Sequence, residues 1–303
     1  MNNNAYVNST NGERYTDTDI IVIDKETESH HTYDVRFNTD VIRTIVTDTA
    51  SIVDEWIHGV YKSFSDKLKD GNNLIVGLDI EWVRLREDNQ NQRNRIAVLQ
   101  LCSGNQCLIF QFFGCDKIPE SLINFVNDGR IIFVGSGIDQ DARKLWVDYG
   151  LNVAISEELG GLADYTLGRS DCYRSGLKSL MYKVFGEVLH KPRGITLSRW
   201  DYEFLKDEQV LYACIDAYAS YLLGMELMPR REIVNKDGPK EDLKKTPQQT
   251  NQGQGPKAPN QGQGARAPNQ VQGAKAPSQG QGARPRYSES RRIRKPTLWD
   301  FIV

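Results

Sequence analysis

The apolar run from Leu74 to Val83, Leu-Ile-Val-Gly-Leu-Asp-Ile-Glu-Trp-Val, is the feature of this chain that most restricts its fold. Its β-branched residues and the turn residues of the preceding 70–73 segment predict a buried strand. Side chains alternate across a strand, so Asp79 and Glu81 share one face, roughly 6.5 Å apart. Two such carboxylates repel each other and lose hydration, a cost that a bound divalent cation would remove. The alternative is an edge strand with a solvated acidic face.

A third carboxylate lies beyond another predicted strand. Residues 131–134 predict a buried strand, and the spacing of apolar residues over 138–146 predicts a helix. Asp141 therefore falls in the first turn of a helix at the carboxyl end of a strand, where open α/β sheets bind ligands. A phosphate-binding loop at Gly135 and Gly137 is the alternative, but neither Gly-Lys-Ser/Thr nor a third glycine at dinucleotide-fold spacing follows.

The third segment is a predicted helix over residues 207–223, with a continuous set of apolar positions. Tyr212 and Asp216 are four residues apart, so they share one face of this helix. A carboxylate beside so much apolar surface is either solvated or held by a partner. For Tyr212 the alternative is an amphipathic tyrosine of the core.

In this order, the three segments resemble the motifs of the DEDDy 3′–5′ exonucleases. The matching residues are Asp-Ile-Glu at 79–81, Gly-Ile-Asp-Gln-Asp at 137–141 and Tyr-Ala-Cys-Ile-Asp-Ala-Tyr at 212–218. The chain is most similar to the Werner-syndrome-type exonuclease domain, especially the small stand-alone versions found in plants. Leu211 stands where the DEDDh branch has its histidine, which favours the tyrosine branch. Arg143 stands where the Werner protein has an aromatic residue, and we expect it to tune strand contacts.

The resemblance implies a role for each matching residue. Asp79, Glu81, Asp141 and Asp216 would be metal ligands, and Tyr212 would position the attacking water. Two divalent cations, Mg²⁺ or Mn²⁺, suit such carboxylate ligands. The implied activity is metal-dependent release of nucleoside monophosphates from DNA or RNA 3′ ends. The alternative is a catalytically weak nucleic-acid-binding or scaffold protein that keeps the exonuclease fold.

The order of predicted elements favours an α/β fold, a ribonuclease H-like mixed sheet flanked by helices. Three strands able to pair antiparallel precede alternating helices and strands. The expected strands span residues 33–37, 41–46, 74–83, 95–102, 106–112 and 130–135, with a short one near 152–156. The expected helices span residues 49–69, 118–127, 139–149, 175–186 and 207–227.

Composition divides the chain into three parts. We expect a disordered polar N-terminus over 1–28, an exonuclease domain over 29–228 with its motif-bearing core at about 70–228, and a disordered basic tail over 229–303. The tail holds 15 of the chain's 38 Lys/Arg and 6 of its 40 Asp/Glu, so it is net +9 and residues 1–228 are net −11. The net negative charge of residues 1–228 does not favour binding to nucleic acid, so we expect the basic tail to attract the phosphates.

The tail combines low complexity with an apolar end. Four nine-residue repeats, each rich in Gly and Gln with little to bury, occupy residues 251–286 and predict disorder. The basic run 291–295 is a nuclear-import or phosphate-binding patch, or only a solvating segment. Leu298, Trp299 and Phe301 then form either a docking motif for a protein partner or a segment that packs back onto the domain.

Neither a membrane nor an oxidising compartment is expected. No stretch approaches the ~20 apolar residues of a membrane span, and the N-terminus lacks the apolar core of a signal peptide. The five cysteines form no C-x-x-C pair, which favours free thiols in a reducing compartment. We therefore expect a nuclear or cytoplasmic location, or both.

Overall fold

One mixed β-sheet organises the residues that the computed structural model describes, which are 14–24, 27, 29–83, 94–115 and 117–237. Across these residues the strand order is β2-β3-β4-β7-β6-β5-β8-β9. The strands are β2 (Thr18–Asp24), β3 (His31–Phe37), β4 (Asp40–Thr47), β5 (Leu74–Trp82), β6 (Ile96–Ser103), β7 (Gln106–Gln111), β8 (Ile131–Gly135) and β9 (Ser156–Glu158). A separate short pair joins β1 (Arg14–Tyr15) to β10 (Glu187–Val188).

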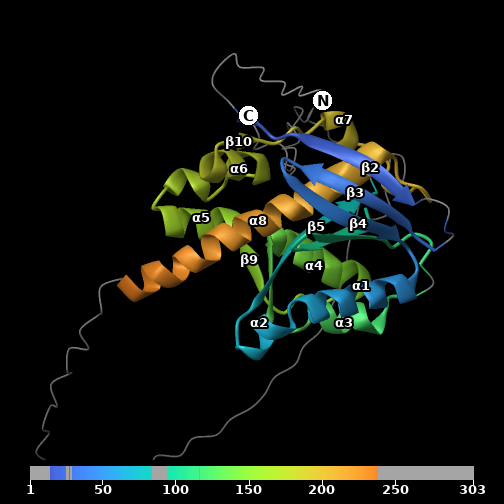
Figure 1. The fold of residues 1–303 in the computed structure, drawn as a ribbon, viewed down its shortest axis with the longest axis horizontal. Helices are drawn as coiled ribbons and strands as arrows, with labels where there is room; N and C mark the ends of the chain where they lie inside the picture. The colour runs from blue at the N-terminus through green and yellow to red at the C-terminus, as the bar shows by residue number, and fades with distance from the viewer. Residues whose placement is uncertain (1–13, 25–26, 28, 84–93, 116, 238–303) are drawn as a thin grey trace, which may run out of the picture. The chain divides into compact units, whose positions relative to one another are not determined.

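Helices cover both faces of this sheet (Figure 1). They are α1 (Ala50–Ser63), α2 (Ser65–Lys69), α3 (Glu120–Val126), α4 (Ile138–Tyr149), α5 (Leu159–Leu167), α6 (Leu177–Phe185), α7 (Arg193–Thr196) and α8 (Asp207–Asp237). One hydrophobic core lies between the sheet and α1, α3 and α4, and the other between the sheet and α5, α6 and α8. The predicted mixed α/β sheet flanked by helices is therefore confirmed.

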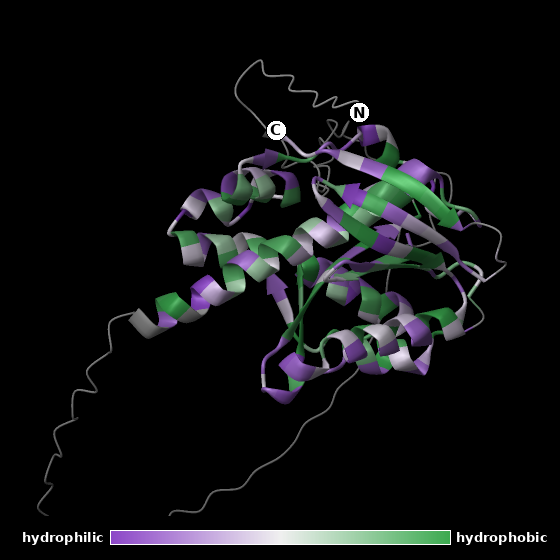
Figure 2. Ribbon diagram, viewed as in Figure 1, coloured by the Kyte–Doolittle hydropathy of each residue, from purple (hydrophilic) through white to green (hydrophobic). Residues whose placement is uncertain are grey.

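Strand β5 lies in the interior of the sheet, in keeping with side chains that are mostly apolar and buried. It pairs antiparallel with β6 and parallel with β8, so hydrogen-bonded neighbours lie on both of its edges. Leu78 and Ile80 belong to the core under α1 and α4, which directs the alternate positions 77, 79 and 81 toward α8. Figure 2 shows the central strands as largely hydrophobic, whereas α1 mixes hydrophobic and hydrophilic segments.

Helix α8 approaches β5 unusually closely, and Gly77 permits it. A Cβ atom added at Gly77 would lie 2.0 Å from the carbonyl oxygen of Ala217 and 2.6 Å from the backbone nitrogen of Tyr221. Any side chain there would force the helix away from the strand. The absence of a side chain at this one position thus sets the distance between the strand and the helix that carry the predicted site.

Helix α8 also has the length and mean hydropathy, 1.2 over its most apolar window, of a membrane-spanning helix. However, 72% of that window is buried inside the protein. This burial accounts for its apolar composition, since both sides of the helix pack against the sheet and against α5 and α6. Its composition is therefore that of a core helix.

The structure corrects several boundaries predicted from the sequence. Residues 14–24 were expected in a disordered N-terminus, but they contain β1 and β2, because β1 pairs with β10 and β2 with β3. Helix α8 runs to Asp237, nine residues into the predicted tail. The expected helix over 49–69 breaks at Phe64, and α5 was not predicted. The repeats, the basic run and the terminal docking motif lie outside the described residues.

Replacing Gly77 with alanine should destabilise the fold. The new methyl group would overlap the α8 backbone, and overpacking of this kind costs about 1–3 kcal/mol. Gly59→Ala is the matched control, because its nearest atom is 3.7 Å away and a helical glycine replaced by alanine gains roughly 0.5–1 kcal/mol. Urea unfolding of both variants measures the difference, and equal stability of the two would contradict this account of the strand–helix contact.

Candidate active site

The first two predicted site residues lie on β5, where the strand faces α8. Glu81 is buried and 6% exposed, and Asp79 is half-buried. The backbone N–H of Ile80 donates a 2.9 Å hydrogen bond to Asp79 Oδ1, which fixes one oxygen of that carboxylate. Because β5 is paired on both edges, the alternative of an edge strand with a solvated acidic face is excluded.

Asp141 reaches the same region from α4. That helix begins after Gly137, whose φ of 84° is in the left-handed region that favours glycine, so the chain turns sharply from β8 into the helix. The Gly137 N–H donates a 2.8 Å hydrogen bond to Glu158 at the end of β9. Asp141, in the first turn, is 8% exposed. The glycines therefore shape the start of a helix that carries a buried carboxylate.

Tyr212 and Asp216 project from α8, one turn apart, and both are buried. The first turn of α8 is held by Gln209, whose Nε2 donates to Ser198 Oγ and to the Arg199 carbonyl at 3.0 and 2.9 Å. This contact fixes the 198–199 segment against the start of the helix. Just before it, the Thr196 hydroxyl donates a 3.2 Å hydrogen bond to the Tyr212 hydroxyl.

The electrostatics show that these groups from three elements lie together. Burial raises the pKa of Asp79 to about 7, and the neighbouring Asp216 carboxylate adds to the rise. Burial and the Asp79 charge hold the pKa of Asp141 well above its usual range. Burial also raises the pKa of Tyr212, helped by the charges of Asp216 and Glu81, so its phenol stays protonated. The structure thus brings all five predicted residues into one acidic cluster.

Lys191 is a member of this cluster that the sequence did not indicate. Its Nζ lies 2.6 Å from Asp216 Oδ1, and the two side chains are only 5% and 1% exposed. The ammonium also lies 5.5 Å from the centroid of the Tyr212 ring. Lys191 comes from the irregular segment between β10 and α7, about 25 residues before Asp216, and no periodicity or motif in that segment marks it.

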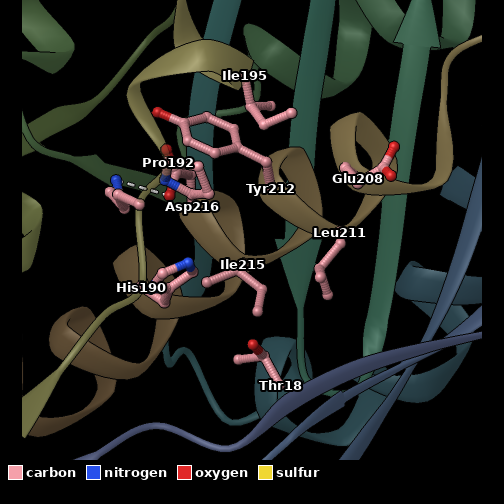
Figure 3. Close-up of a pocket in the computed structure, with 10 residues that line it drawn as sticks. Thr18, His190, Pro192, Ile195, Glu208, Leu211, Tyr212, Ile215 and Asp216 are labelled. Atoms are coloured by element: carbon pink, nitrogen blue, oxygen red, sulfur yellow. Dashed lines mark ion pairs between the residues drawn. The ribbon is translucent and has the colours of Figure 1, made fainter.

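Beside this ion pair lies a pocket of about 370 Å³ (Figure 3). Its apolar walls are Pro192, Ile195, Leu211 and Ile215, and Tyr212 and Asp216 line it as well. In Figure 3 the dashed line marks the ion pair at Asp216, close to Pro192. The end of the cluster formed by Tyr212 and Asp216 therefore borders an open space.

The donor chemistry of the cluster fits a divalent cation. Asp79, Glu81, Asp141 and Asp216 offer only carboxylate oxygens, the ligands of Mg²⁺ and Mn²⁺. Burial raises the pKa of all three aspartates, and neighbouring carboxylates add to the rise for Asp79 and Asp141, a cost that a bound cation would offset. In this conformation, however, no three His, Cys, Asp or Glu side chains of the described segments converge tightly enough to enclose an ion.

The pKa of Asp79 predicts how stability responds to pH without divalent cations. Between about pH 4 and 7 the folded protein retains a proton on Asp79 that the unfolded chain has lost, so the free energy of unfolding falls as pH rises through this window. Urea unfolding in EDTA should show a smaller fall for Asp79→Asn than for the unchanged protein. Asp66→Asn, at a side chain that is 92% exposed, is the control. Parallel pH profiles for Asp79→Asn and the unchanged protein would contradict the burial of this carboxylate.

Comparison with known proteins places this arrangement in a family. A 3′–5′ exonuclease of Arabidopsis thaliana is 34% identical over 194 residues, which are 64% of this chain and 66% of the plant protein. The mouse bifunctional 3′–5′ exonuclease/ATP-dependent helicase WRN is 31% identical over 167 residues, or 55% of this chain and 12% of that protein. The crystal structure of Escherichia coli RNase D has a TM-score of 0.47 at 18% identity, covering 61% of this chain and 43% of that one.

The chain thus spans less than two thirds of the length of either curated relative. The model of the 3′–5′ exonuclease domain family matches residues 60–231, more than half of the chain. The matched region begins in α1, ends in α8 and contains all five predicted site residues together with Lys191. This chain belongs to the 3′–5′ exonuclease domain family.

Proposed function

We propose that this protein hydrolyses the terminal phosphodiester bond at nucleic-acid 3′ ends and releases nucleoside monophosphates. The observation that carries the proposal is the buried cluster of Asp79 on β5, Asp141 on α4 and Asp216 on α8, in which the Asp216 charge raises the pKa of Asp79 and the Asp79 charge raises that of Asp141. Phosphoryl transfer depends mainly on positioning and on neutralising charge, and a cation bound by such carboxylates does both.

Asp79, Glu81 and Asp216 would hold one divalent cation, and Asp79 and Asp141 a second. When bound, such a pair lowers the pKa of a water molecule and neutralises the leaving 3′ oxygen. The two strand carboxylates are the fixed part of this arrangement, because β5 is paired on both edges. The helix carboxylate Asp216 is set by the approach of α8 at Gly77.

Tyr212 would hold the attacking water by a hydrogen bond. Its raised pKa keeps the phenol neutral throughout the physiological range, so it orients the water without taking its proton. The Thr196 hydroxyl donates to the phenol oxygen, which leaves the phenolic proton available to another acceptor. The same phenol interacts with Asp216 and favours the charged form of that carboxylate. These contacts support a positioning role over that of a core tyrosine alone.

We also propose a nuclear or cytoplasmic location for the protein, or both. A docking role for Leu298, Trp299 and Phe301 is part of the same proposal, and these residues lie outside the described ranges. The tail has a net charge of +9, whereas residues 1–228 have a net charge of −11. This difference supports attraction of nucleic-acid phosphates by the tail.

An end-labelled oligonucleotide with Mg²⁺ or Mn²⁺ tests the activity. A 3′-to-5′ ladder of products is expected, with a sealed circular substrate resistant to cleavage. Asp79→Ala should lower turnover by several orders of magnitude, because it would remove the carboxylate proposed to hold both ions. Asp66→Ala, on the exposed face of α2, should leave turnover unchanged. Cuts within the circle, or full activity of Asp79→Ala, would exclude the proposed reaction.

Tyr212→Phe separates water positioning from packing, since only the hydroxyl is lost. We expect turnover to fall on the order of 10²–10³-fold, as for the loss of one oriented polar group in an active site. Cation affinity should change little, because the phenol is not a proposed ligand. Thr196→Val is the companion variant, and it should lower turnover less because it removes only the partner that orients the phenol. Undiminished turnover of Tyr212→Phe would return Tyr212 to a purely structural role.

A further inference from the structure

Lys191 is a buried cation placed among the proposed metal ligands. Its Nζ lies 2.6 Å from Asp216 Oδ1 and 5.5 Å from the centroid of the Tyr212 ring. Its charge lowers the pKa of Asp79 as well as that of Asp216, opposing the larger effect of burial on both. One ammonium group therefore acts on carboxylates from both β5 and α8.

This ion pair differs from the others in the described part of the chain. The remaining pairs each have at least one side chain that is 25% exposed or more, whereas Lys191 and Asp216 are both at most 5% exposed. Exposed ion pairs contribute little, but breaking a buried pair leaves an uncompensated charge. Lys191 thus supplies positive charge where carboxylates are buried together.

A divalent cation at the same place would compete with this ammonium. Both need the Asp216 carboxylate, and two positive charges a few ångströms apart in a buried site repel each other strongly. The divalent ion gains more, because it interacts with several carboxylates at once. Lys191 lines the pocket of about 370 Å³, and it lies in the irregular segment between β10 and α7. The Lys191 side chain therefore has room to move away from Asp216.

We propose that Lys191 is the internal counter-cation of the ion-free site and that a divalent cation displaces it from Asp216. This inference rests on the proposed function, since it requires that the acidic cluster bind such a cation. The ammonium keeps the carboxylates together before the ion arrives. Because only molecules with a released Asp216 are competent to bind, Lys191 also lowers the apparent cation affinity and sets the ion concentration at which the site fills.

Mn²⁺ titration followed by electron paramagnetic resonance, without substrate, tests the displacement. Lys191→Met should bind Mn²⁺ about tenfold more tightly, because the competing charge is gone. In EDTA the same variant should be less stable than the unchanged protein, and saturating Mn²⁺ should reduce or reverse that difference. Lys191→Gln provides a second neutral variant, and Lys183→Met, at an ion pair with Asp171, is the matched control expected to leave Mn²⁺ affinity unchanged.

A measurement on the unchanged protein avoids any folding defect of a variant. Mass spectrometry after brief acetylation should find Lys191 protected in EDTA, where its side chain is 5% exposed, and modified in Mn²⁺. Equal or weaker Mn²⁺ binding by both neutral variants, or protection of Lys191 in both conditions, would overturn the inference. The proposed function itself fails in two other cases: if the unchanged protein does not bind Mn²⁺, or if Asp79→Ala binds it equally well. Either result is distinct from those that would overturn the role of Lys191.

Discussion

The approach of α8 to β5 at Gly77 is the contact on which the rest of this structure depends. A methyl group at that position would meet backbone atoms of Ala217 and Tyr221, so no side chain is compatible with the observed distance. Asp79 lies two residues beyond Gly77 on the strand, and Asp216 is next to Ala217 on the helix. The backbone contact therefore determines how far apart these two carboxylates lie, and with it whether one cation can bind both.

The acidic cluster opposes folding stability in the absence of a cation. Burial raises the pKa of Asp79, Asp141 and Asp216, which means that the folded state disfavours their charged forms. A protein can retain such groups when neighbouring interactions compensate them. Here the Ile80 N–H and the Lys191 ammonium act in that direction, one as a backbone donor and the other as a charge. Cation binding and folding stability are therefore linked through the same carboxylates.

Hydrogen bonds at the ends of helices and strands, and in the segment between β10 and α8, fix the groups around the cluster. Glu158 accepts from the Gly137 N–H and holds the start of α4, and Gln209 ties the start of α8 to Ser198. Thr196 donates to the Tyr212 hydroxyl from the same stretch that carries Lys191. The segment between β10 and α8 thus contributes to the site as directly as the regular elements do, although it has little secondary structure of its own.

The sequence by itself determined the elements that carry the site. Alternating and helical patterns around Asp79, Asp141 and Tyr212 predicted a strand and two helices, and the structure confirms all three. These patterns are local, since a strand or helix buries one periodic face. Only the tertiary structure decided the partners of these residues. Lys191 pairs with Asp216, and Glu158 binds the start of α4, from segments that no periodic pattern links to those partners. Likewise, β2 forms because it pairs with β3. Burial and charge at the site depend on contacts between residues distant in sequence, so local pattern could not predict them.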